Sequence, residues 1–263
     1  MAYNFRWMME DNMGLFDKFR KEPKTSVTKK HIFDCDTPID KSNYFEVFSA
    51  CLGKVSVNQS VCSDLVVKGR NWNVDFSQGT ISFGNDSYPV QFIGSESSSS
   101  NTWLWGWANK SQLPENVLIE ANRLKKLGET YGLEALTIPQ FELSESYNGH
   151  KLSIICAALN DNNVCYYRGP HQGGAIFVEF YGIPHDVFQP VSAKTFLDVT
   201  SQAIQQYSVE HKIFVTSFLY QNETPYKWSG DTLVATFKNG ETLNISFERI
   251  DSLWRIKGIS GTI

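Results

Sequence analysis

The chain has 263 residues, of which 41% are apolar and 20% are charged, a composition typical of a globular protein that buries a core, and its length predicts two domains. The net charge of −4 gives no overall attraction to phosphate backbones, which disfavours nucleic acid as a partner. No window approaches the roughly 18 apolar residues of a membrane-spanning helix, and residues 1–30 lack the apolar core of a signal peptide.

Residues 1–40 predict a flexible or loosely docked tail. A short amphipathic piece from Leu15 to Arg20 precedes a stretch rich in Lys, Ser, Thr and Pro. Apolar side chains beside basic ones leave a weak association with a membrane surface open. Residues 13–16 resemble a natural bacterial start, so the sequence leaves open whether residues 1–12 are native.

The expected first domain, residues 41–183, begins with a helix and a hairpin. Asn43 is a candidate N-cap, with Glu46 three positions on and apolar residues at helical spacing after it. Alternating residues predict strands at 72–76 and 80–83, joined by a turn at 78–79.

The rest of this domain is expected to alternate strands with one more helix. Strands are predicted at 90–94 and 102–109, and a helix at 114–128. Two hairpins then follow: residues 141–147 turn at Asn148-Gly149 into a strand at 151–159, which turns again into a strand at 164–167. A last strand is predicted at 175–181.

Two prolines within residues 183–190 mark the expected boundary, so the second domain spans residues 184–263. Ser192 predicts the N-cap of a helix. Four antiparallel strands are then expected at 212–220, 232–238, 241–248 and 253–259, with a turn at Asn239-Gly240. The predicted fold class is α+β, with two domains of antiparallel sheet, each packed with one or two helices.

Two resemblances accompany this architecture. The helix-then-sheet order of residues 184–263 resembles the cystatin-like or nuclear-transport-factor-like roll, in topology and not in a motif. Residues 43–182 carry Trp72-x-x-Asp75, Gly94-Ser95, the string Trp-x-Trp-x-Trp-Ala-Asn from Trp103, and Tyr167-Arg168-Gly169-Pro170. With these motifs the segment is similar to a family of uncharacterised bacterial proteins, a domain of unknown function. The resemblance implies an architecture and a bacterial origin, but no activity, ligand or catalytic residue.

Three tryptophans stand two positions apart, at Trp103, Trp105 and Trp107. Alternate residues of a strand share a face, so these rings are expected to lie together. We favour core packing beneath the helix at 114–128 over an aromatic platform that stacks a flat ligand.

The loop around Arg168 is the best local candidate for a ligand site. Arg168 could clamp a carboxylate or phosphate, with Tyr167 and His171 beside it, while Gly173 and Gly174 allow backbone amides to approach an anion. The spacing matches neither the phosphate-binding loop nor the dinucleotide fingerprint. A hairpin connection that needs positive φ explains the glycines equally well.

The sequence contains no complete catalytic set. Five histidines lie on separate elements without metal-binding spacing, so we predict no metal and no cofactor. Five cysteines without C-x-x-C spacing predict free thiols in a reducing cytoplasm. Cys156 and Cys165, in opposed strands of one predicted hairpin, are interpreted as core residues and not as nucleophiles.

We therefore expect a non-catalytic bacterial protein that acts through protein–protein contacts, of an immunity, antitoxin or defence-associated type. The alternative is a small-ligand-binding protein or enzyme, with a pocket in the C-terminal roll or beside Arg168. The sequence leaves open the partner, the ligand, the oligomeric state and the motion of one domain against the other.

Overall fold

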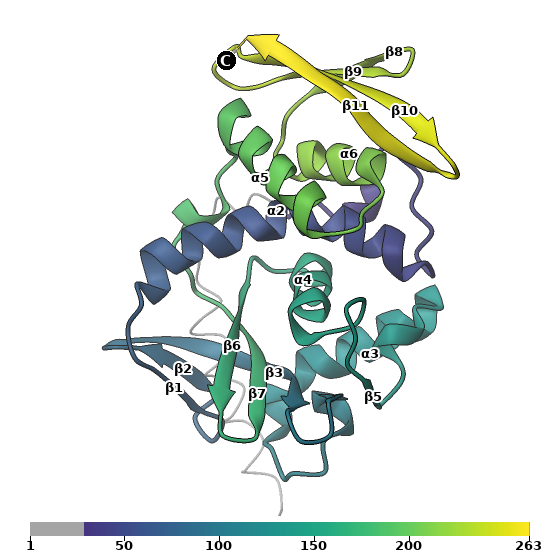
Figure 1. Ribbon diagram of the computed structural model, residues 1–263. Coiled ribbons are helices and arrows are strands. Elements are labelled where there is room, and N and C mark those ends of the chain that lie inside the picture. Colours follow the sequence, from purple (N-terminus) through teal and green to yellow (C-terminus); the bar gives the residue numbers. More distant parts are fainter. Residues whose placement is uncertain (1–28, 263) are drawn as a thin grey trace, which may run out of the picture.

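Helices lie between two antiparallel sheets in the structure, a computed structural model that describes residues 29–262 (Figure 1). The predicted α+β class is confirmed. The amphipathic piece from Leu15 to Arg20, and with it the expectation of weak membrane association, lies outside the described residues.

The larger sheet has seven strands built around one long strand. It comprises β1 (Trp72–Asp75), β2 (Thr80–Phe83), β3 (Asp86–Ser97), β4 (Thr102–Trp105), β5 (Gln140–Glu142), β6 (Cys165–His171) and β7 (Gly174–Phe180). The order is β1-β2-β3-β4-β5, and β7 pairs with both β3 and β6. β3 can serve three neighbours because its first residues pair with β2, whereas its later residues pair with β7 and β4.

Five α-helices lie in the described residues. They are α2 (Tyr44–Cys62), α3 (Ile119–Tyr131), α4 (Gly149–Leu159), α5 (Ala193–Gln206) and α6 (His211–Gln221). Asn43 Oδ1 accepts a hydrogen bond from Phe45 N at 3.0 Å, and Ser192 Oγ accepts one from Thr195 N at 3.4 Å. Both predicted N-caps are therefore confirmed, since each side chain accepts from an amide that the first turn leaves unpaired.

Two segments predicted as strands, residues 151–159 and 212–220, are helices. Asn148 caps α4 by accepting from Lys151 N at 3.1 Å, in place of the predicted hairpin turn, and Glu210 caps α6 by accepting from Ile213 N at 2.7 Å. Both predictions were wrong for one reason. Each segment is a nearly continuous apolar run that is buried on all sides, so it lacks the periodicity that separates a helix from a strand.

The smaller sheet closes the C-terminal end of the chain. It comprises β8 (Tyr226–Ser229), β9 (Thr232–Thr236), β10 (Thr242–Ile250) and β11 (Leu253–Thr262), in the order β11-β10-β9-β8. The predicted four-stranded antiparallel sheet is thus present, with β8 as its first strand instead of residues 212–220. Gly240 adopts a φ of 85° in the turn before β10, which only glycine adopts readily.

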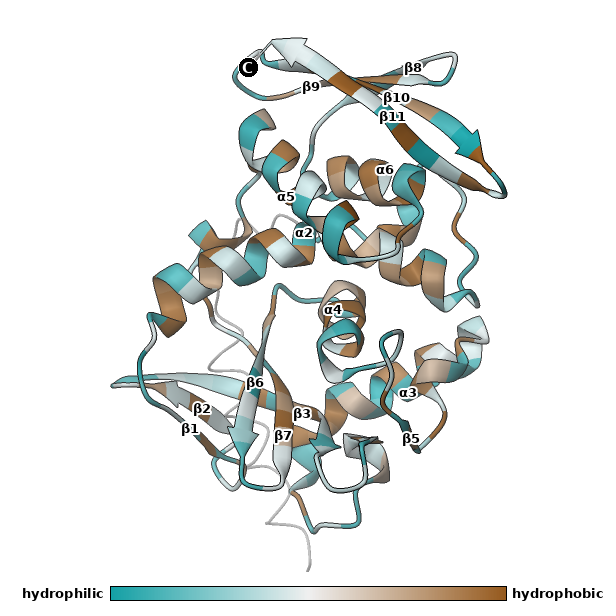
Figure 2. Cartoon of the chain, in the orientation of Figure 1, coloured by the Kyte–Doolittle hydropathy of each residue, from teal (hydrophilic) through white to brown (hydrophobic). Residues whose placement is uncertain are grey.

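The main core passes through the helical layer from one sheet to the other. Buried residues of α2, α4, α5, α6 and both sheets form one hydrophobic cluster, and Figure 2 shows hydrophobic segments along α2 and α6. The contact between these two helices is close: a Cβ added at Gly53 would lie 2.6 Å from Phe218 Cγ. α2 therefore joins the larger sheet to the C-terminal helices.

Candidate functional site

Two of the three tryptophans are buried in the core. Trp103 and Trp105 lie on β4 with no exposed surface, their ring centroids are 5.2 Å apart, and Trp105 Nε1 donates to Ala135 O at 3.1 Å. The strand ends at Trp105, so Trp107 follows in a short 3-10 turn, where the Lys125 ammonium lies 4.8 Å from its ring centroid. Neither buried ring offers a face to a ligand.

Arg168 lies on β6 beside a carboxylate. Its Nε is 3.7 Å from Glu96 Oε2, and Glu96 Oε1 accepts a hydrogen bond from Gly149 N at 2.7 Å. The guanidinium also lies over the Phe177 ring, 6.0 Å from its centroid. The charge of Arg168 is therefore balanced by Glu96.

The other residues of this candidate loop form the β6–β7 hairpin. Tyr167 packs on aromatic rings, and Gly173 N donates to His171 Nδ1 at 3.1 Å. Gly174 has a φ of 147°, and a Cβ there would lie 1.9 Å from Glu96 O, so the close approach of β7 to β3 requires glycine. Arg168 and His171 are three positions apart on the strand, which directs their side chains to opposite faces.

The cysteines and histidines assemble no reactive centre within residues 29–262. All five cysteines are free and buried. Cys156 lies on α4 and Cys165 on β6, so they are not in opposed strands of one hairpin as predicted, because residues 151–159 are helical. Burial raises the pKa of the Cys156 thiol. No group of three or more His, Cys, Asp or Glu side chains in this range is placed to hold a metal ion.

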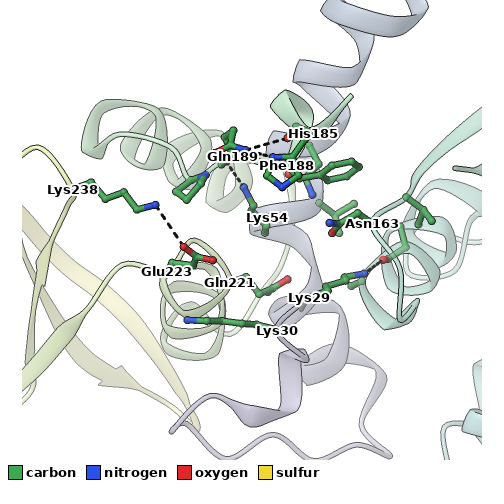
Figure 3. A pocket seen from close by; sticks show the side chains of 16 residues that line it. Lys29, Lys30, Lys54, Asn163, His185, Phe188, Gln189, Gln221, Glu223 and Lys238 are labelled. Carbon is green, nitrogen blue, oxygen red and sulfur yellow. Dashed lines mark hydrogen bonds and ion pairs between the residues drawn. The ribbon is translucent and has the colours of Figure 1, made fainter. Parts of the chain in front are cut away.

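A cavity of about 180 Å³ lies where α2, α6, the α4–β6 connection and residues 185–190 meet (Figure 3). Four lysines line it, namely Lys29, Lys30, Lys54 and Lys238, together with a single carboxylate, Glu223. This concentration of positive charge occurs in a chain whose net charge is −4. A concave cationic surface focuses the field on anions.

Lys54 is a buried lysine without an ion-pair partner among the described residues. It lies in the middle of α2 and is only 7% exposed. Its Nζ donates to Gln189 O at 2.7 Å, the one hydrogen bond that it makes within residues 29–262. Burial lowers the pKa of this ammonium from 10.5 to about 8. Two of its three donors thus have no partner in the described part of the chain.

The other three lysines are already engaged. Lys29 Nζ donates to Ala157 O at 2.8 Å, Asn160 O at 2.6 Å and Asn162 O at 3.2 Å, which uses all its donors at the C-terminal end of α4. Lys238 Nζ lies 3.5 Å from Glu223 Oε2, and Lys30 Nζ lies 4.7 Å from the centroid of the Tyr220 ring. Of these four lysines, Lys54 is therefore the buried one that keeps free donors for an anion.

The remaining wall combines amide groups with apolar side chains. Asn58 lies one turn after Lys54, and its Oδ1 is buried without a hydrogen-bond partner among residues 29–262. The side chain of Gln189 is hydrogen-bonded to His185 Nδ1 (Figure 3). Apolar surface comes mainly from Val55, Val164, Phe188 and Pro190. The wall can therefore contact an apolar part of a ligand as well as a charged part.

A second cavity, of about 660 Å³, surrounds the start of α2 and is lined by Tyr44, Phe48 and Tyr147. Its charged side chains, Glu134 and Lys151, are not buried, and the Lys151 ammonium lies 5.3 Å from the centroid of the Phe48 ring. This cavity contains no buried charge that calls for a counter-ion, so the smaller one is the stronger candidate.

Sequence reasoning missed Lys54, although one signal was present. Lys54 is the single charged residue in residues 47–63, a stretch in which Val and Ser are the commonest residues. A lone lysine within such a stretch of a helix indicates a charge that faces the interior. The residues that surround it come from distant segments, which the sequence alone does not bring together.

The comparisons with known proteins identify a family for the part of the chain that contains α2. A family model described as a family of unknown function (DUF6882) matches residues 46–181, more than half of the chain. No match was found among curated proteins or among solved structures. No helix within residues 29–262 has the length and apolar character needed to cross a membrane. The matched segment includes Lys54 and Asn58, whereas Gln189 and Gln221, which also line the cavity, follow it. The chain therefore belongs to DUF6882, a family of unknown function.

Proposed function

We propose that this chain is a binding protein that holds a small anionic ligand beside Lys54. The proposal depends on one observation, a lysine that is only 7% exposed and whose ammonium makes a single hydrogen bond within residues 29–262. Burying a charge without a counter-ion is costly, by several kcal/mol. An anion in the adjacent cavity offsets that cost, which gives a buried lysine at this position a functional reason.

Thermal unfolding in the presence of small anions tests the proposal. At constant ionic strength and pH 7, an anion at about 100 times its dissociation constant stabilises the native state by about 2.7 kcal/mol. For a chain of this size, that raises the Tm by about 5–10 °C. We expect the shift in the wild type and its loss in Lys54→Met.

A matched control separates this site from general charge effects. Lys194 is exposed on α5, is paired with Asp198 at 2.7 Å and does not line the cavity, so Lys194→Met removes the same charge outside the site and is expected to keep the shift. The proposal fails if formate, acetate, propanoate, phosphate and citrate all leave the wild-type Tm unchanged, or shift it equally in Lys54→Met.

Contacts with another protein are a second proposal, of the immunity, antitoxin or defence-associated type. It is supported by an aromatic content of 14% and by exposed apolar side chains, among them Ile119 at 56% and Ile250 at 51%. Co-purification from the native host is the test, and the lack of any reproducible partner contradicts this proposal.

Both proposals place the chain in the reducing cytoplasm of a bacterium. Five free, buried cysteines are compatible with that compartment. The likeness of residues 184–263 to a cystatin-like roll is likewise proposed, and it is supported by a four-stranded antiparallel sheet that follows helices in the chain.

A further inference from the structure

The hydrogen-bond donors that remain free at the cavity indicate how its ligand is bound. Lys29 is saturated by three carbonyl oxygens, Lys238 is paired with Glu223, and Lys30 is exposed beside Tyr220. Lys54 is then the buried ammonium that keeps free donors, and Glu223, whose charge raises the pKa of Lys54, does not form an ion pair with it in the described part of the chain. One carboxylate group can accept hydrogen bonds from both free donors of Lys54.

The hydrogen-bonding groups of the wall also disfavour phosphate. None of the described residues that line the cavity is an arginine, the side chain that binds phosphate oxygens in a bidentate manner. The end of α4 that borders the cavity is its C-terminus, where carbonyl oxygens carry partial negative charge. No α-helix N-terminus, which would favour a phosphate group, lines the cavity within residues 29–262.

The volume of the cavity limits the size of the ligand. An apolar cavity of about 150 Å³ holds one benzene molecule, and this cavity measures about 180 Å³. Nucleotides and other ligands of drug size occupy pockets of about 300–1,000 Å³. The space therefore accommodates roughly six to eight non-hydrogen atoms.

We infer that the ligand beside Lys54 is a compact monocarboxylate with a short apolar body, and this inference rests on the proposed function. The carboxylate accepts hydrogen bonds from the two free donors of Lys54. The hydrocarbon part packs against Val55, Phe188 and Pro190, which removes apolar surface from water.

Isothermal titration of the full chain at pH 7 and constant ionic strength tests the ligand class. The probes are acetate, propanoate and butanoate, against inorganic phosphate and pyrophosphate. We expect the three alkanoates to bind, with affinity rising roughly fourfold for each added CH2 group. Phosphate and pyrophosphate are expected to bind at least tenfold more weakly than butanoate. Lys54→Met is expected to abolish binding of the alkanoates, and Lys194→Met to retain it.

The possible results distinguish an error in the inferred ligand class from an error in the proposed function. If phosphate or pyrophosphate binds more tightly than every alkanoate and Lys54→Met abolishes that binding, the ligand class is wrong and the proposed function stands. If no probe binds, or if Lys54→Met binds as the wild type does, both are wrong. Alkanoate affinity that stays constant from acetate to butanoate also overturns the inference, because it shows that no apolar wall contacts the ligand.

A proton measurement at pH 8 provides a second readout. A bound carboxylate stabilises the charged form of Lys54, whose pKa is lowered to about 8 by burial. Binding is therefore expected to take up protons near this pH, which makes the titration enthalpy depend on the ionisation enthalpy of the buffer. Enthalpies that are equal in phosphate-free buffers of different ionisation enthalpy indicate binding away from Lys54 and overturn the inference.

Discussion

Replacing Lys54 by methionine is expected to stabilise the protein while it removes anion binding. Burial lowers the pKa of this ammonium from 10.5 to about 8, which at about 1.4 kcal/mol per pKa unit corresponds to a cost of about 3 kcal/mol at neutral pH. Methionine fills similar space without charge, but Gln189 O loses its donor, at a cost of about 1 kcal/mol. The net gain is about 2 kcal/mol.

Urea unfolding at pH 7 measures this gain, with Lys194→Met as the surface control that is expected to change stability by less than about 0.5 kcal/mol. The gain is expected to vanish as pH rises. Between pH 8 and 10.5 the native state has released the Lys54 proton and the unfolded chain still holds it, so wild-type stability rises relative to the variant. If Lys54→Met is less stable than the wild type at pH 7, Lys54 serves the fold and the reasoning from its burial is refuted.

Three further variants test the fold around the site. Glu179→Gln is expected to stabilise the protein by an amount that grows from pH 4.5 to pH 8, because burial raises the pKa of Glu179 to about 8 and the unfolded carboxyl ionises first. Urea midpoints at pH 5 and pH 8 measure it, and equal midpoint shifts contradict it. Gly53→Ala is expected to cost about 1–3 kcal/mol, since its Cβ would meet Phe218. An unchanged urea midpoint would mean that α2 and α6 are not in contact. Asn148→Ala is expected to cost about 1 kcal/mol through loss of the α4 cap, with chemical denaturation as the measurement and no change as the contrary result.

The proposed site is placed across the boundary that the sequence suggested at residues 183–190. Lys54 and Asn58 come from α2, within the family match, whereas Gln189, Gln221 and Lys238 follow it. Ligands often bind at junctions of this kind. The family segment then supplies the charge, and the part after it supplies much of the wall.

Local sequence signals predicted the elements that begin at an N-cap residue or are joined by a glycine turn. Asn43 and Ser192 were recognised as N-caps because their side chains bond to amides two or three residues on. The hairpin of β1 and β2 was recognised because Gly79 permits a positive φ, here 64°, between two alternating strands. These features depend on neighbours in the chain, which the sequence displays.

Only the tertiary structure decided the identity of α4 and α6 and the position of the candidate site. The apolar runs that form these helices have no polar face, because other elements bury them on every side, and periodicity then carries no information. The burial of Lys54 was likewise decided by the tertiary structure. Its charge is visible in the sequence, but its burial results from walls contributed by the α4–β6 connection, residues 185–190 and α6. A contact between segments more than a hundred residues apart, such as that of Lys54 with Gln189, is fixed by packing and not by local pattern.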